Sequence, residues 1–232
     1  MYMFKKRLFL LVGSALAFVS PNDASALSYL VPASANISAA GLGLPVAPGG
    51  GGAGTLPVLQ PVQPGQTSFR FSTSGMVSQY FEGYYQSGGG APYPVDIFSY
   101  GGVSGFKADV TLPLVGVFLS SNPPQGPAPM TLQFTSQGLG LDFATLSPGL
   151  GQVFLIGDGK TSGNADQTFF VPANATRLFL GYADAPFSTG DPGAFDDNRG
   201  ALTVEVTAVP EPGLTALLGL AGVAMMFRRK IS

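Results

Sequence analysis

The segment 169–206 gathers oxygen-bearing side chains on a loop between two apolar runs. The oxygen-bearing residues are Asp184, Asp191, Asp196, Asp197 and Asn198, and glycines stand at positions 190, 193 and 200. Ca²⁺ takes six to eight oxygen ligands in a flexible geometry, and a glycine-bearing loop with these side chains can supply such oxygens. Adjacent Asp197 and Asn198 cannot both point inward from a regular strand, but on a loop they can. The pattern indicates a Ca²⁺ site, and solvated turns remain the alternative because Asp, Asn and Gly are also common turn residues.

Catalytic chemistry finds little support in the composition. The chain of 232 residues contains no His, no Cys and no Trp. It therefore lacks the usual general base near neutral pH, the commonest transition-metal ligand and any thiolate or disulfide. Nothing marks a carboxylate pair for glycoside hydrolysis, although the separation that such a pair needs is spatial. We expect a protein that is not an enzyme.

The elements that must position these residues have the pattern of an all-β protein. From Thr67 onward, short apolar or alternating runs are separated by Gly and Pro, and no amphipathic helical stretch of useful length occurs before Val209. The run 201–207 places Leu202, Val204 and Val206 on one face, as in a half-buried strand. We predict one antiparallel β-sandwich or jelly roll over residues 67–208. The expected strands are 68–73, 95–100, 114–119, 130–135, 152–156, 167–171, 177–182 and 201–207.

Phenylalanine is the residue type expected to fill the core of this domain, because aromatic side chains in such a pattern mostly serve packing. The expected core residues are Phe69, Phe71, Phe98, Phe118, Phe154, Phe169, Phe170 and Phe179.

The segment 27–66 differs in composition from the rest. Ala, Gly, Pro and Ser dominate it, and a glycine tract runs from Gly49 to Gly52. Few large side chains are present to offset the entropy of ordering the backbone. We predict a flexible linker or stalk over 27–66, with a first strand around Tyr29 to Val31 as an open alternative.

The N-terminus has the order of features of a secretory signal peptide. Lys5, Lys6 and Arg7 precede an apolar run over 8–19, and a small-residue site follows at 24–26. The apolar run is about 12 residues long, whereas a membrane-spanning helix needs roughly 20. We predict a signal peptide over 1–26, cleaved before Leu27.

The C-terminus has the features of a second export signal, over 209–232. Val209, Pro210, Glu211 and Pro212 precede an apolar stretch over 213–227 and a basic end at 228–230. Basic residues hold the end of a hydrophobic segment on the cytoplasmic side, and the stretch of about 15 residues is short for a permanent span. A simple membrane anchor is the alternative to a processed tail.

The letters of this tail resemble the PEP-CTERM sorting signal of Gram-negative and cyanobacterial surface proteins. The resemblance covers residues 209–230. It implies recognition by an exosortase, cleavage near Pro210 to Pro212, and a destination at the cell surface or in the extracellular matrix, with membrane contact only through the tail before processing. Removal of both ends leaves residues 27–210, with five basic and eleven acidic residues. That balance argues against nucleic acid as a partner.

A second resemblance covers about 35 residues from Val171 to Val206. The matching features are an apolar strand ending at Asp184, then Pro192-Gly193, Phe195, Asp197-Asn198, Gly200 and an alternating strand. This stretch resembles the C-terminal region of the PA-IL-type galactose-binding bacterial lectins. The resemblance implies a β-sandwich in which one Ca²⁺ at a surface loop bridges to two sugar hydroxyls.

The resemblance also implies a ligand set. Asp184, Asp197 and Asn198 would donate side-chain oxygens to Ca²⁺ and contact the sugar, while Ala194 and Gln79 would offer backbone carbonyls. The chain departs from the lectins in three ways: Asp197 stands where they carry Asn, residues 185–191 are inserted, and their sugar-contacting His has no counterpart. The comparison with the lectins therefore supports metal binding more strongly than it supports a preference for galactose.

These observations together predict an exported surface protein with a Ca²⁺-dependent, lectin-like domain that engages extracellular polysaccharide. The alternative is a structural protein of the matrix or biofilm whose lectin-like scaffold binds no sugar.

Overall fold

The computed structural model describes residues 26–79 and 86–210, and over these residues the protein is all-β. Strands and two short 3₁₀ helices make up its regular structure, and no α-helix occurs in the described part. The elements are β1 (Ala26–Pro32), η1 (Ile37–Ala39), β2 (Val58–Pro61), β3 (Gln66–Ser78), β4 (Val95–Ile97), β5 (Phe106–Ala108), β6 (Val115–Leu119), β7 (Gln133–Phe134), β8 (Thr145–Leu146), β9 (Val153–Leu155), β10 (Thr168–Phe170), β11 (Arg177–Gly181), η2 (Pro186–Ser188), β12 (Thr189–Gly190) and β13 (Arg199–Pro210). Each of the eight strands expected from the sequence overlaps an observed strand.

The strands form three sheets, in the orders β1-β13-β3-β10-β8, β2-β11-β6-β9 and β12-β4-β5-β7. Most neighbouring pairs are antiparallel, including every pair of the second sheet. Three short pairs of strands are parallel, namely β10 with β8, β12 with β4 and β5 with β7. The prediction of an all-β fold with antiparallel sheets is therefore confirmed.

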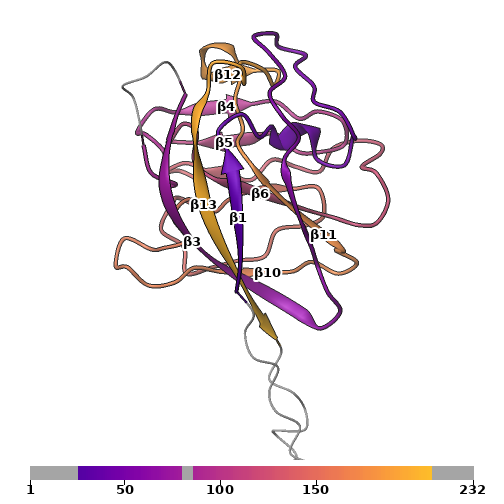
Figure 1. Cartoon of the computed structure of the whole chain (residues 1–232), viewed down its shortest axis with the longest axis vertical. Helices are drawn as coiled ribbons and strands as arrows, with labels where there is room; N and C mark the ends of the chain where they lie inside the picture. The colour runs from indigo at the N-terminus through magenta and orange to yellow at the C-terminus, as the bar shows by residue number, and fades with distance from the viewer. Residues whose placement is uncertain (1–25, 80–85, 211–232) are drawn as a thin grey trace, which may run out of the picture. The chain divides into compact units, whose positions relative to one another are not determined.

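The longest pairing in the fold joins β13 to β3, with β1 on the other side of β13 (Figure 1). Leu202, Val204 and Val206 of β13 are buried, and the residues between them are only partly so. This alternation is the one expected for a strand with a single face on the core. The 12 residues of β13 span about 40 Å.

Phenylalanine rings connect the first two sheets. Phe69 of β3 stacks on Phe118 of β6 with ring centroids 6.1 Å apart, and Phe169 of β10 lies 5.5 Å from Phe154 of β9. Both contacts lie within the range in which aromatic pairs add to burial energy. Of the eight phenylalanines predicted for the core, six are buried.

Phe98 and Phe170 were wrongly predicted for the core, being 52% and 43% exposed. Phe170 directly follows buried Phe169 in β10, and successive side chains of a strand point to opposite faces. Phe98 stands in the same relation to buried Ile97, one residue beyond the end of β4.

The segment 27–66 differs from the predicted flexible linker, because it is built into the β structure. β1 pairs with β13 over its whole length, and Val31, Ala35 and Ile37 are buried. β2 pairs with β11, and the Tyr29 hydroxyl of β1 donates a hydrogen bond to the Gln60 side chain of β2. Small residues therefore do not signal mobility here, since backbone pairing and close packing order the segment without large side chains.

The predicted signal peptide and most of the predicted sorting tail lie outside the described residues. Val209 and Pro210 are the last residues of β13, paired with Ser68 and Gln66 across a register irregularity, whereas Glu211 and Pro212 are not described. Among residues 26–79 and 86–210, no helix is long and apolar enough to cross a membrane.

Candidate metal site

Asp184 is a buried carboxylate three residues beyond the end of β11. Only 2% of its surface is exposed. Its Oδ1 atom accepts hydrogen bonds from the backbone N–H of Ala185 at 2.8 Å and from the Gln79 amide at 3.2 Å, and its Oδ2 atom accepts one from Asn198 at 2.9 Å. A buried carboxylate requires such partners, because removal from water penalises its charged form.

Sheet register explains why three residues far apart in sequence meet at this point. Ser78 of β3 pairs with Arg199 of β13, so Gln79 and Asn198 lie just beyond the same paired end of the two strands. The Gln79 amide also donates to Ser188 Oγ at 3.4 Å, and its carbonyl oxygen accepts from the Thr111 hydroxyl at 2.6 Å. These bonds hold the Gln79 side chain against Asp184.

Two side-chain oxygens of the site are buried without any hydrogen-bond partner. They are Oδ1 of Asp197 and Oδ1 of Asn198. The Asn198 amide nitrogen is occupied, since it donates to Asp184 and to the Ala33 carbonyl at 3.3 Å, which leaves its oxygen alone. Both residues lie on the loop before β13. On this loop two adjacent residues bury side-chain oxygens, as expected from the sequence. An unpaired buried polar atom costs about 1–3 kcal/mol and calls for an explanation such as an ion.

The electrostatics of the two carboxylates indicate a site short of positive charge. Burial raises the pKa of Asp184 to about 7, outweighing the hydrogen bonds from Asn198, Ala185 and Gln79 that lower it, and the nearby charge of Asp197 raises it further. Burial also raises the pKa of Asp197, with a further contribution from the charge of Asp196 and an opposing one from Arg199. A bound cation would reverse both effects, because it favours the ionised forms.

The loop that carries Ala194 is held by the glycine tract of the predicted linker. Gly49 N–H donates to the Pro192 carbonyl at 3.0 Å, and Ala194 N–H donates to the Gly50 carbonyl at 2.8 Å. A β-carbon on Gly49 would lie 2.3 Å from the Asp191 carbonyl oxygen, and one on Gly193 would lie 2.2 Å from the Gly50 carbonyl oxygen. We call residues 49–54 the glycine clasp, because glycine alone allows this backbone approach.

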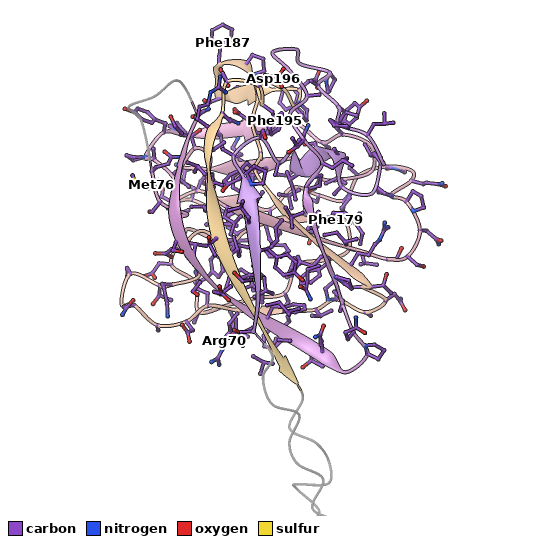
Figure 2. All side chains as sticks on the ribbon, viewed as in Figure 1. Arg70, Met76, Phe179, Phe187, Phe195 and Asp196 are labelled. Carbon is purple, nitrogen blue, oxygen red and sulfur yellow. The ribbon has the colours of Figure 1, made fainter. Side chains whose placement is uncertain are left out.

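The remaining loop residues occupy different surroundings. Ala194 has a left-handed φ of 63°, which an alanine adopts only where its surroundings hold it. Asp196 is exposed and accepts a hydrogen bond from Gly54 N–H of the clasp at 3.1 Å, and Asp191 is exposed as well. Figure 2 labels Asp196 and Phe195 at the end of the molecule that carries β12.

The structure thus brings together Asp184, Asn198 and Gln79, with Asp197 next to Asn198 in the chain. Gln79 contributes its side-chain amide, a contact that was not predicted from the sequence. Thr111, Ser188 and Ala33 were missed, and no sequence signal marks them, because each reaches the site through long-range packing or the inserted segment. No cluster of three or more Asp or Glu side chains occurs among the described residues, so a cation here would also need amide and carbonyl oxygens.

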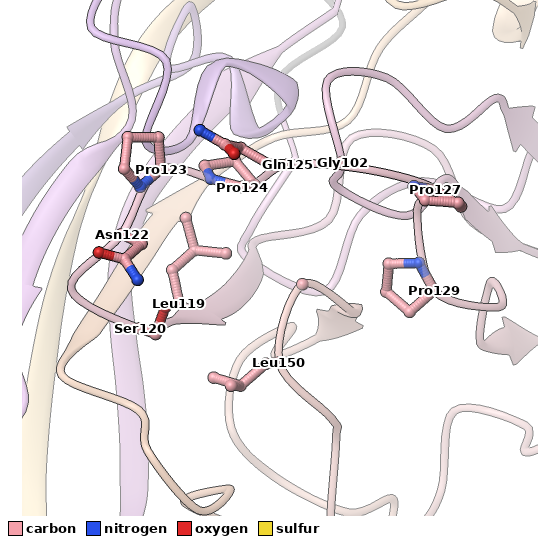
Figure 3. A pocket seen from close by; sticks show the side chains of 11 residues that line it. Gly102, Leu119, Ser120, Asn122, Pro123, Pro124, Gln125, Pro127, Pro129 and Leu150 are labelled. Atoms are coloured by element: carbon pink, nitrogen blue, oxygen red, sulfur yellow. The ribbon is translucent and has the colours of Figure 1, made fainter.

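A separate hollow of about 560 Å³ lies beside the proline-rich loop 122–129 (Figure 3). Pro123, Pro124, Pro127 and Pro129 line it together with Leu119 and Leu150. None of its lining residues is charged, and none belongs to the Asp184 site. It therefore offers no side chain that could act as an acid or a base, and no carboxylate that could bind a metal.

Comparison of the chain with protein-family models, with curated proteins and with solved structures finds no match. The geometry of the Asp184 site is therefore the basis for a functional assignment.

Proposed function

We propose that this is a non-catalytic, exported surface protein whose β domain binds Ca²⁺ and, through the cation, carbohydrate. The observation that carries the proposal is the pair of buried, unpartnered oxygens on Asp197 and Asn198 beside the buried carboxylate of Asp184. Ca²⁺ is the common biological cation that accepts carboxylate, amide and carbonyl oxygens together in an irregular arrangement.

The residues present fit the cation in kind, and solvent or a ligand would complete the six to eight oxygens that Ca²⁺ takes. Asp184 and Asp197 would supply negative charge, Asn198 an amide oxygen, and Ala194 or Gln79 carbonyl oxygens. Asn198 would keep its hydrogen bond to Asp184 while its free Oδ1 faces the ion, so binding requires no bond in this pair to break. The cation would offer its open positions to hydroxyl groups of a ligand.

Titration calorimetry of the full chain in mild detergent tests the metal. We expect a saturable heat of Ca²⁺ binding for the wild type. The double variant with Asp184→Ala and Asp197→Ala should give no heat of binding. Asp142→Asn is the matched control, because Asp142 is an exposed carboxylate hydrogen-bonded to Ser162. Absence of a saturable heat in the wild type would contradict the proposal.

The carbohydrate part requires that the bound cation keep positions open toward solvent, on the loop that also carries exposed Asp196. Vicinal hydroxyls of a sugar can replace two waters on Ca²⁺ without ionising, and Asp184 and Asn198 offer hydrogen-bonding atoms nearby. Methyl glycosides of galactose, mannose and fucose, added with and without EDTA, test this step by NMR line broadening. Binding that EDTA abolishes supports it, whereas Ca²⁺ uptake without sugar binding would leave a matrix protein with a lectin-like scaffold.

We further propose that the first two sheets face each other as a sandwich and that both chain ends are processed. The Phe69–Phe118 and Phe154–Phe169 contacts support the sandwich, and the sequence features of residues 1–26 and 209–232 support the processing. A crystal structure in millimolar Ca²⁺ tests the first. Mass spectrometry of protein from the native host tests the second, with a start at Leu27 and an end near residues 210–212 expected, the latter lost in a strain without exosortase.

A further inference from the structure

Phe187 is a phenylalanine that the fold displays instead of burying. Its side chain is fully exposed, and its backbone has a left-handed φ of 60°, followed by Ser188 at 62°. A bulky residue with positive φ is an outlier that persists only where the surrounding structure imposes it. Figure 2 places Phe187 at the same end of the molecule as Asp196 and Phe195.

The turn that carries Phe187 is fastened on both sides to the candidate metal site. Before it, Ala185 N–H donates to Oδ1 of Asp184 at 2.8 Å, and Ser188 N–H closes the turn on the Ala185 carbonyl at 2.9 Å. After it, Ser188 Oγ accepts from the Gln79 amide, which itself bonds Asp184. The exposure of the ring is therefore fixed by the same hydrogen bonds that position the carboxylate.

A second exposed aromatic residue stands beside this turn. Phe98 donates its backbone N–H to the Gly190 carbonyl at 2.8 Å, and its side chain is 52% exposed. The segment 185–191 thus begins beside the carboxylate of Asp184, carries the exposed ring of Phe187 and is bonded at Gly190 to the backbone of Phe98.

A pyranose ring has the matching chemistry. Its hydroxyls lie around the edge, where they can reach a cation and its oxygen ligands, whereas several C–H groups form an apolar face. An aromatic ring against that face removes apolar surface from water and adds the electrostatic attraction between C–H groups and the π-face. No single planar cluster of hydroxyl-binding groups could recognise both aspects of the sugar.

We propose that Phe187 packs against the apolar face of the bound sugar and is a specificity-determining residue for it. The inference rests on the proposed Ca²⁺-dependent sugar binding and adds the class of ligand, a pyranose with a flat C–H face next to vicinal hydroxyls.

The test measures Ca²⁺ and sugar binding separately on the full chain in mild detergent. Calorimetry follows Ca²⁺ alone, and NMR follows methyl α-D-galactopyranoside, methyl α-D-mannopyranoside and methyl α-L-fucopyranoside in millimolar Ca²⁺. The variants are Phe187→Ala, the ring-preserving Phe187→Tyr, and Phe170→Ala as the matched control. Phe170 is an exposed phenylalanine on β10, which pairs with β3 at Phe69 and Ser68, far along the strand from Gln79.

We expect Phe187→Ala to weaken sugar binding about five- to tenfold, the effect of losing one aromatic contact. Phe187→Tyr and Phe170→Ala should bind sugar as the wild type does, and all variants should bind Ca²⁺ equally. Unchanged sugar affinity in Phe187→Ala would overturn the inference while the proposed function stands. A parallel loss of Ca²⁺ affinity would overturn it by showing that Phe187 supports the loop instead of the ligand. A wild type that binds Ca²⁺ and none of the three sugars would remove the proposed sugar binding and the inference together.

Discussion

Asn198 donates a hydrogen bond from Nδ2 to Oδ2 of Asp184 at 2.9 Å, and both side chains are almost completely buried. The donor stabilises a carboxylate that burial disfavours, while the other end of the same amide has no partner. One side chain thus satisfies the acid and leaves an oxygen for a further group.

Replacement of Asn198 by an acid should make the stability of the protein depend more strongly on Ca²⁺. In Asn198→Asp, two carboxylates would face each other in a buried site, so without Ca²⁺ at pH 8 we expect a loss of about 2–4 kcal/mol in the free energy of unfolding. Ca²⁺ should restore more stability to this variant than to the wild type. Urea denaturation in EDTA and in millimolar Ca²⁺ measures both values, and an equal response of the two proteins to Ca²⁺ would argue against a cation at Asn198.

The titration of Asp184 predicts a pH dependence of stability. Burial raises the pKa of Asp184 from the ordinary value of 3.8 to about 7, so the folded state holds the proton more tightly than the unfolded state. The stabilisation from this group is therefore complete below about pH 4 and is lost as the pH rises through 7. Between pH 4 and pH 8 in EDTA, the wild type should lose about 2–4 kcal/mol relative to Asp184→Asn, which does not titrate. Urea denaturation measures this loss. A constant difference in the free energy of unfolding between the two proteins across this range would refute the raised pKa of Asp184. Ca²⁺ should reduce the loss in the wild type by favouring the ionised form.

The glycine clasp predicts that a single methyl group loosens the loop. In Gly49→Ala the new carbon would meet the Asp191 carbonyl oxygen at 2.3 Å, so the clasp and the loop must separate. We expect a loss of about 1–3 kcal/mol, together with weaker Ca²⁺ binding. Gly89→Ala is the control, because a β-carbon on Gly89 has no neighbour within 4 Å and the residue has no positive φ. Urea midpoints measure the stability, and equal midpoints for the two variants would mean that the clasp does not hold the loop.

The aromatic contact between the first two sheets predicts the largest stability effect. Phe118 of the second sheet is fully buried and stacks on Phe69 of the first sheet with ring centroids 6.1 Å apart. Phe118→Ala should cost about 3–5 kcal/mol through lost burial and the cavity that remains. Phe170→Ala, at an exposed position of β10, should cost less than about 1 kcal/mol. Thermal unfolding followed by circular dichroism compares them, and similar melting temperatures would exclude Phe118 from the core.

Side-chain alternation made much of the fold predictable. In β13, the period of two in Leu202, Val204 and Val206 specifies both the strand and its buried face, whereas β6 is buried at every position and is recognised as a short apolar run. The glycine clasp could not be predicted in this way. Its contacts are between backbone groups, as in the Gly49–Pro192 hydrogen bond, and backbone pairing leaves no side-chain pattern to detect.

The sequence predicted which residues form the candidate site better than it predicted how they are arranged. Resemblance to a lectin motif selected Asp184, Asp197 and Asn198, and the register of β3 with β13 explains why Gln79 joins them. The role of the Gln79 side chain depends on Thr111 and Ser188, whose contacts with it span 32 and 109 residues of sequence. Such contacts are consequences of tertiary packing, which no local spacing encodes.

The strand β13 begins one residue after Asn198 and ends at Pro210, with β1 and β3 hydrogen-bonded along its two sides. A chain held by residues beyond Pro210 while its loop end grips a large ligand would be stretched along this strand. The hydrogen bonds on both sides lie across the direction of pull, so they would share the load together instead of opening one after another. If the proposed attachment through the C-terminus holds, the strand that positions Asn198 would therefore also be the mechanical link between the loop end of the domain and that attachment.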